Sequence, residues 1–128
     1  MPLYRCSVSP GLTSYEQRSR IAKEVTRIHC EVTGALPLFV HTVFSDDREG
    51  RLPAGKRAFL LGTIRAGRTP AQKQRLAAEL ASALAGVLGV TPAELGVVTV
   101  DVPASWVMEG GQILPEPGDE AAWAARRA

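Results

Sequence analysis

The sequence contains little from which a metal centre, a disulfide framework or a membrane span could be built. Its two cysteines, Cys6 and Cys30, match no metal-binding spacing, and we expect both to be reduced thiols. No apolar run approaches the roughly 18 residues that a membrane-spanning helix needs. The first residues also lack the basic and apolar regions of a secretory signal. We therefore expect a cytoplasmic protein with no metal ion and no membrane partner.

The chain also has little net charge. The chain has 15 Lys and Arg against 13 Asp and Glu, a formal net charge of +2. So small a charge gives no reason to expect a nucleic-acid partner. Its length of 128 residues and its hydrophobic content of 45% are those of one globular domain.

The predicted elements follow the order strand, helix, strand, twice over. Strand-like runs lie at residues 3–9, 38–44, 57–65 and 97–102, and a small helix is predicted at 120–127 with Trp123 as its anchor. This order indicates an α+β fold with a duplicated β-α-β unit, at about 1–56 and 57–112, and a C-terminal extension at 113–128. A ferredoxin-like fold has the same element order and is the alternative.

Both long helices carry start and stop signals. Capping boxes at residues 13–16 and 69–72 predict Thr13 and Thr69 as N-caps. Gly34 and Gly89 follow the last periodic residues and are expected to cap the C-terminal ends in a left-handed conformation.

One histidine and one glutamate are candidates for handling a proton or a water. His29 lies on the edge of the apolar seam of the first helix, which consists of Tyr15, Ile21, Ala22, Val25, Ile28 and Val32. Glu109 lies in a loop before two glycines. A helix-edge histidine is more often a core residue, and such a glutamate is more often a surface carboxylate. Together they could polarise one water molecule by hydrogen bonding. His41 lies in a predicted strand, and we expect it to pack.

Two arginines flank the turn that follows the third strand. Arg65 ends that strand, and Arg68 follows across Ala66-Gly67. Guanidinium groups so close together can converge on one carboxylate, and the N-terminus of the next helix adds positive potential there. The alternative is that both arginines are simply solvated.

Pro2 follows the initiator methionine directly. An aminopeptidase normally removes Met1 before so small a residue, which would leave a secondary amine at the start of a strand. Burial and nearby arginines would favour the neutral amine, a base, whereas a close Glu109 would favour the ammonium, an acid. If Met1 is retained, the Pro2 nitrogen is an amide and cannot serve as the catalyst.

Five segments of this chain occur in the order of a known family. They are Pro2, His29 to Gly34, Ile64 to Arg68, Pro103 to Glu109, and Leu114 to Gly118. With them the chain resembles the tautomerase superfamily, and specifically its cis-3-chloroacrylic acid dehalogenase group. The resemblance covers nearly all of the chain. One position departs, because Val98 stands where the dehalogenase has a tyrosine.

The resemblance implies a fold, an assembly and an activity. The tautomerase fold places two helices on a mainly four-stranded mixed sheet, and three chains form a homotrimer. The activity would be a cofactor-free keto–enol tautomerisation of a small anionic carboxylate, a 2-oxo acid or enol such as phenylpyruvate. Pro2, His29 and Glu109 would be catalytic, and Arg65 and Arg68 would bind the substrate carboxylate.

Two other functions fit the same residues. One is hydration or hydrolytic dehalogenation of a cis-3-haloacrylate, with His29 and Glu109 activating water and protonated Pro2 donating a proton. The absence of the tyrosine at Val98 counts against efficient dehalogenation. The other is a non-enzymatic ferredoxin-like binding module.

Overall fold

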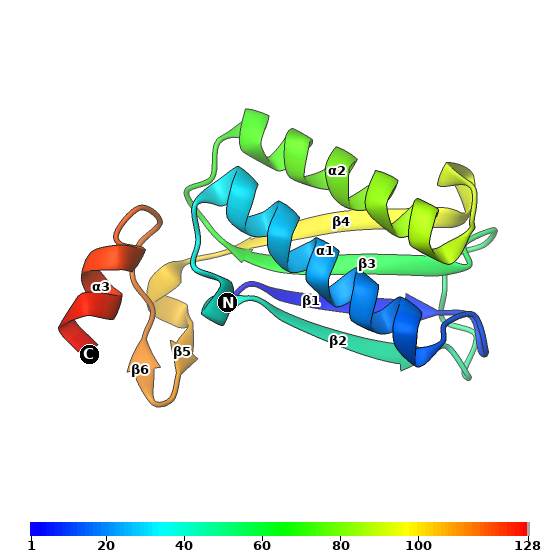
Figure 1. Cartoon of the computed structure of the whole chain (residues 1–128), viewed down its shortest axis with the longest axis horizontal. Coiled ribbons are helices and arrows are strands. Elements are labelled where there is room, and N and C mark those ends of the chain that lie inside the picture. Colours follow the sequence, from blue (N-terminus) through cyan, green and yellow to red (C-terminus); the bar gives the residue numbers. More distant parts are fainter. Residues whose placement is uncertain (128) are drawn as a thin grey trace.

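Two β-α-β units form the body of the molecule, seen in a computed structural model that describes residues 1–127 (Figure 1). The first unit contains β1 (Leu3–Val8), α1 (Tyr15–Thr33) and β2 (His41–Asp46). The second contains β3 (Ala58–Arg65), α2 (Pro70–Leu88) and β4 (Leu95–Val102). Single turns of 3₁₀ helix lie at Pro37–Phe39, Pro92–Glu94 and Ala104–Trp106.

The four long strands form one mixed sheet in the order β2-β1-β3-β4. Within each unit the two strands are parallel neighbours, and the units meet through the antiparallel pair β1 and β3. The predicted α+β class and mixed sheet are therefore confirmed. The ferredoxin-like alternative is wrong, because its β-α-β units are split by an intervening strand and these are not. The predicted repeat boundaries, near residues 56 and 112, stay a prediction.

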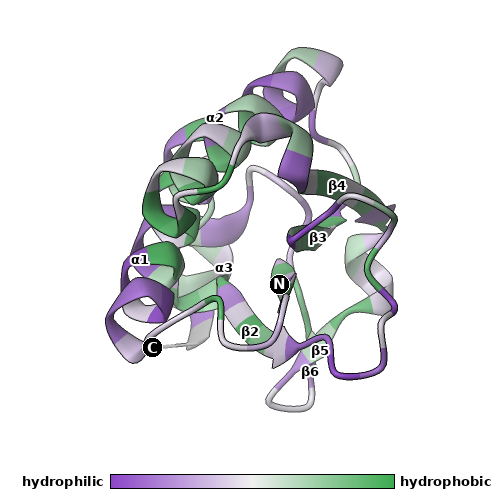
Figure 2. Cartoon of the chain, turned by 90° about the vertical axis from the view of Figure 1, so that its right-hand side faces the viewer, coloured by the Kyte–Doolittle hydropathy of each residue, from purple (hydrophilic) through white to green (hydrophobic). Residues whose placement is uncertain are grey.

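Both long helices cover the same face of the sheet, as the view in Figure 2 makes plain. Side chains along β1 point alternately to the two faces of the sheet. Tyr4, Cys6 and Val8 point toward the helices and are buried, whereas their neighbours are not. They join the buried seams of the helices in one core, which includes Ile21, Val25, Ile28, Leu60, Ile64, Leu76, Leu80 and Leu84. The sheet thus has one face covered by helices and two open edges.

The helix ends agree with the capping signals, with one shift. Both helices end at the predicted glycines in the left-handed conformation, and Thr69 caps α2 as expected. At α1, however, the N-cap is Ser14, whose hydroxyl accepts from the Gln17 N–H at 3.2 Å. Thr13 is engaged elsewhere, since its hydroxyl and carbonyl accept from Arg18 at 3.1 and 3.0 Å.

Three further predictions from the sequence are wrong. Tyr15 was placed in the buried seam of α1, but its side chain is 75% exposed because it occupies the first helical turn, beyond the core. The strand predicted at residues 38–44 begins only at His41, after a turn that buries Phe39. His41 itself is exposed because β2 is an edge strand, so its predicted packing is also wrong.

The last part of the chain folds against one end of the sheet. A short ribbon pairs β5 (Met108–Glu109) with β6 (Gln112–Ile113), and α3 (Glu120–Arg127) follows it (Figure 1). We call residues 113–127 the C-terminal cover. Its anchor is Trp123, as predicted, whose ring stands edge-on against Phe39 with 5.3 Å between ring centroids. In the part of the chain described here, no helix is long and apolar enough to cross a membrane.

Candidate active site

The predicted site residues come from distant parts of the sequence and reach the same end of the sheet. Because β1 and β3 are antiparallel, β1 begins at the end where β3 stops, and α1 finishes and α2 starts there too (Figure 1). His29 lies near the end of α1, Arg65 closes β3, Arg68 precedes α2, and Glu109 ends β5. The topology therefore brings the five candidates to one region, and their catalytic roles stay predictions.

The chain's amino terminus lies within this region. In the full chain the free amine belongs to Met1, which donates to the Phe39 carbonyl at 2.8 Å and forms an ion pair with Glu109 Oε1. Burial lowers the pKa of this amine below its ordinary value of 8.0, outweighing the opposing effect of Glu109. Pro2 is buried, and its carbonyl accepts from the His41 N–H at 3.0 Å. Its nitrogen is part of the Met1-Pro2 peptide bond.

His29 is a buried, neutral imidazole. Its side chain lies on the core side of α1, with only 2% of the residue exposed. Burial, with the positive charges of Arg68 and Arg65 next in effect, lowers the His29 pKa to about 3. The sequence placed His29 at the edge of the buried seam, and the structure places it within the core. A neutral imidazole has one donor and one acceptor nitrogen, so its other contacts decide its chemistry.

The hydrogen bond with Tyr4 indicates which His29 nitrogen carries the proton. Its hydroxyl lies 2.7 Å from His29 Nδ1, and burial raises the Tyr4 pKa, so the phenol keeps its proton. No other hydrogen bond to this hydroxyl occurs among the described residues, so we assign Tyr4 as the donor and Nδ1 as the acceptor. His29 then carries its proton on Nε2 and can offer a hydrogen bond.

A glycine makes room for the Tyr4 ring. Gly62 lies opposite Tyr4 on the neighbouring strand, and a Cβ atom there would stand 2.5 Å from Tyr4 Cε1. No ring carbon tolerates such an approach. Tyr4 was not among the predicted site residues, because its contact with His29 spans 25 residues of sequence and depends on the fold. The only local signal was a buried position with a polar tip on β1.

Arg65 and Arg68, which we call the arginine clamp, converge on one carboxylate, that of Glu120. The distances from Glu120 Oε1 are 2.7 Å to Arg65 Nη2 and 3.2 Å to Arg68 Nη2. Arg65 also donates to the Pro115 carbonyl, and Arg68 donates to the Thr33 carbonyl at 2.9 Å. The alternative of solvated arginines is wrong, because the side chains are 1% and 5% exposed. Sequence reasoning found the clamp and missed Glu120.

Glu109 stands beside an exposed histidine as well as the amine. Its Oε1 lies 3.9 Å from His41 Nδ1, which donates to the Phe39 carbonyl at 2.9 Å. The Glu109 side chain is 29% exposed, so water reaches it. This carboxylate can therefore accept a proton, or orient a cationic amine, at the solvent side of the region.

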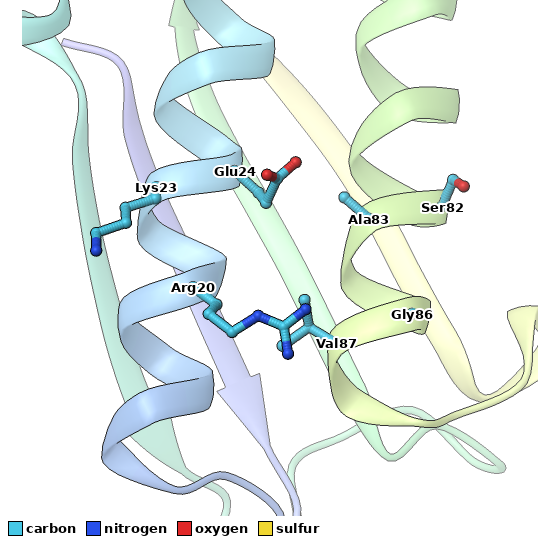
Figure 3. Close-up of a pocket in the computed structure, with 7 residues that line it drawn as sticks. All are labelled: Arg20, Lys23, Glu24, Ser82, Ala83, Gly86 and Val87. Carbon is cyan, nitrogen blue, oxygen red and sulfur yellow. The ribbon is translucent and has the colours of Figure 1, made fainter.

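A separate hollow lies on the outer side of the helices and has no part in this arrangement. It measures about 430 Å³ between α1 and α2. Figure 3 shows its lining, which consists of Arg20, Lys23, Glu24, Ser82, Ala83, Gly86 and Val87. None of the five candidates contributes to it. Among residues 1–127, no three His, Cys, Asp or Glu side chains are grouped as a metal ion would require.

Comparison with known proteins agrees with this geometry. The family described as "Putative oxalocrotonate tautomerase enzyme" (Tautomerase_3) matches residues 1–127. The chain belongs to the tautomerase superfamily. Within it, the chain is similar to N1, a member of the cis-3-chloroacrylic acid dehalogenase family, at 33% identity and a TM-score of 0.89. That match covers 97% of this chain and 91% of N1, and it confirms the predicted cis-3-chloroacrylic acid dehalogenase-like group.

Two further solved structures extend the comparison. Native Ps01740 is 35% identical, with a TM-score of 0.78, over 84% of this chain and all (100%) of its own. A fused 4-OT asymmetric trimer shares the fold at 23% identity and a TM-score of 0.78, covering 95% of this chain and 98% of its own. No curated protein matches the sequence.

The one departure from the family pattern lies on the open edge of the sheet. Val98 of β4 pairs with Leu61 of β3, and 43% of Val98 is exposed. A valine has no hydroxyl with which to hold water or donate a hydrogen bond.

Proposed function

We propose that this member of the tautomerase superfamily is a cofactor-free keto–enol tautomerase of small 2-oxo acids or their enols, with phenylpyruvate as the probe substrate. The observation that carries the proposal is the convergence of the amino terminus, His29, Glu109 and the arginine clamp at one end of the sheet. This isomerisation needs a group that moves a proton, a hydrogen-bond donor and a site that binds the substrate carboxylate.

After Met1 is removed, the Pro2 amine would act as the base. Burial outweighs Glu109 in setting the pKa of the Met1 amine, and Pro2, which is itself buried, would experience the same kind of burial effect once Met1 is gone. A neutral amine near pH 7 can take a proton from C-3 of a 2-oxo acid and return it to oxygen. Glu109 would then stabilise the ammonium form as it appears.

His29 and the clamp would orient the substrate. With Tyr4 on Nδ1, His29 offers Nε2–H and so polarises a carbonyl or carboxylate oxygen. It has no free lone pair with which to deprotonate a water. Arg65 and Arg68 would hold the carboxylate, as predicted from their spacing.

The test combines intact-mass analysis with one substitution. The purified protein should have lost Met1, and Pro2→Ala should lower kcat for phenylpyruvate by about 100-fold or more, the range of general acid–base catalysis. Pro53→Ala, an exposed proline in the loop before β3, is the matched control and should keep full activity. Retained Met1 in an active enzyme, or equal activity of both variants, would rule Pro2 out.

The alternative, hydration or hydrolytic dehalogenation of a cis-3-haloacrylate, has one observation in its favour. Glu109 forms an ion pair with the amino terminus, which favours the ammonium form that this reaction needs. The neutral donor state of His29 and the valine at position 98 count against it. A ¹⁵N NMR titration of Pro2 separates the two, because an ammonium at pH 7 supports hydration and an amine supports tautomerisation. Val98→Tyr should raise any hydratase activity.

We further propose that the protein works as a homotrimer in the cytoplasm. The fused 4-OT structures with the same fold are described as trimers. Both edge strands of this sheet expose valines, Val43 on β2 and Val98 and Val100 on β4, which suit burial against another copy. Light scattering should give three times the monomer mass of 13.7 kDa. A monomer at micromolar concentration would contradict the proposal.

A further inference from the structure

The carboxylate of Glu120 is held by three donors on two sides. Arg65 and Arg68 bind Oε1, and the Gly118 N–H donates to Oε2 at 2.8 Å. Burial opposes its ionisation, but hydrogen bonds from its own backbone N–H and from Gly118, together with the charge of Arg65, hold the Glu120 pKa below the usual range. Glu120 is therefore a fixed anion inside the clamp at neutral pH.

The helix that carries Glu120 is firmly attached. Trp123 packs on Phe39 and donates from Nε1 to the Ile113 carbonyl at 3.2 Å, while Arg65 binds the Pro115 carbonyl. Besides Glu120 itself, the Trp123–Phe39 contact and the Arg65–Pro115 hydrogen bond therefore hold this segment against the rest of the molecule. This arrangement suits a permanent component of the site better than a side chain that leaves when a ligand arrives.

One donor of the clamp is left over. Arg68 Nε is the one buried side-chain nitrogen or oxygen without a hydrogen-bond partner within residues 1–127. The other two nitrogens of this guanidinium are engaged, Nη1 by Thr33 and Nη2 by Glu120. A buried charged donor without an acceptor is unfavourable, and such a group is usually satisfied by a ligand or a water. An oxygen of a ligand or a water would satisfy this donor.

Charge limits what that oxygen can belong to. Two guanidinium groups and one carboxylate give the clamp a net charge of +1 (2 − 1 = +1), and His29 beside it is neutral. One ligand carboxylate neutralises this charge. A second would lie in a region that already contains Glu120 and, at the amino terminus, Glu109.

We propose that Glu120 is a positioning and selectivity residue of the arginine clamp. Its carboxylate leaves Arg68 Nε to bind the substrate and restricts the site to monocarboxylates. This inference rests on the proposed function, because it assumes that the clamp receives the substrate. It adds the substrate class, a monoanion, and a residue outside the predicted set.

The experiment measures binding, not turnover, so that it is independent of the tautomerase assay. Protein with ¹⁵N-labelled arginine is titrated with benzoate, a monoanion, and with isophthalate, which adds a second carboxylate to the same ring. The Arg68 Nε–H signal, assigned with Arg68→Lys, should move on saturation with benzoate. Benzoate binding in a protein that does not isomerise phenylpyruvate would refute the proposed reaction and leave this inference standing.

The decisive variant is Glu120→Gln, which keeps an acceptor oxygen and raises the clamp charge to +2 (one carboxylate fewer). Since attraction scales with ligand charge, the affinity ratio of isophthalate to benzoate should rise about tenfold or more. The matched control is Asp119→Asn, which removes an exposed carboxylate one residue away and should leave the ratio unchanged.

Three results would overturn the proposal. An Arg68 Nε–H signal that does not move in the wild-type protein refutes the binding role, and this holds even if Glu120→Gln does not fold. An unchanged ratio in a folded variant refutes the charge selection. An equal gain in affinity for both ligands would make Glu120 a competing occupant of the clamp, not a part of it.

Discussion

The two ends of the sheet contain the same kind of ion pair in opposite surroundings. At the end away from the candidate site, Arg51 and Glu49 pair with side chains that are 82% and 69% exposed. At the site end, Arg65 and Glu120 pair with side chains that are 1% and 6% exposed. Both are arginine–glutamate pairs, so the difference between them lies in burial and in the additional partners of Glu120, which are Arg68 and the Gly118 N–H.

The C-terminal cover creates this difference. Loops at the far end remain open to water, where ion pairs contribute little to stability. At the site end both charged side chains are buried, and each charge depends on its partners. Charges that are costly to bury are retained where they serve a purpose, which agrees with a site at the covered end and a plain surface at the other.

The largest expected difference between the two ends of the sheet is the loss of stability when the arginine of each pair is replaced. Arg65→Met leaves Glu120 buried with one partner fewer, which should lower the free energy of unfolding by about 3–5 kcal/mol. Arg51→Met, the control at the far end, should change it by less than about 0.5 kcal/mol. Urea unfolding of both variants measures the contrast. Similar small losses would mean that the cover does not exclude water.

The second difference concerns pH. The folded His29 has a pKa of about 3 against an ordinary 6.5, so between these values the unfolded chain binds the proton and the folded chain does not. Stability from this group is therefore complete above pH 6.5 and falls as the pH drops toward 3, by on the order of 2–4 kcal/mol.

Two controls isolate the His29 contribution. Unfolding between pH 4.5 and 6.5 excludes Glu120, whose lowered pKa affects stability only below its ordinary value of 4.5. His29→Gln should abolish the slope in this interval, and His41→Gln should keep it. A slope that survives in His29→Gln would show that another group is responsible.

The third difference compares two glycines that lie beneath aromatic rings. Added Cβ atoms would stand 2.5 Å from Tyr4 at Gly62 and 2.5 Å from Phe59 at Gly96. Tyr4 is fully buried and bound to His29, whereas Phe59 is half-buried and has room to move. We expect Gly62→Ala to cost about 1–3 kcal/mol and Gly96→Ala clearly less, by thermal unfolding. Equal costs would show that Tyr4 is not held more rigidly than Phe59.

The smallest expected effect concerns the Tyr4 hydroxyl. Tyr4→Phe leaves His29 Nδ1 without its donor and should cost about 1 kcal/mol. Without this donor, His29 should no longer be restricted to the Nε2–H tautomer. ¹⁵N NMR of the imidazole reports the tautomer directly. An unchanged Nε2–H tautomer in the variant would contradict the role assigned to Tyr4.

Much of this molecule could be predicted because the relevant signals are local. The strand-like run at residues 3–9 identified β1, and Gly34 identified the end of α1. Arg65 and Arg68 were found because a tight turn fixes their proximity. Tyr4 and Glu120 could not be found in this way, because their partners lie 25 and 55 residues away and meet them only through the sheet and the cover.

The contact between Met1 and Glu109 imposes an order of events during synthesis. The amine is half-enclosed by residues near position 39 and by a carboxylate that leaves the ribosome about a hundred residues later. An aminopeptidase acts on an extended terminus, so removal of Met1, if it takes place, would have to occur while the chain is still emerging and before β5 forms. A full-length chain refolded with Met1 in place should therefore resist digestion by an aminopeptidase.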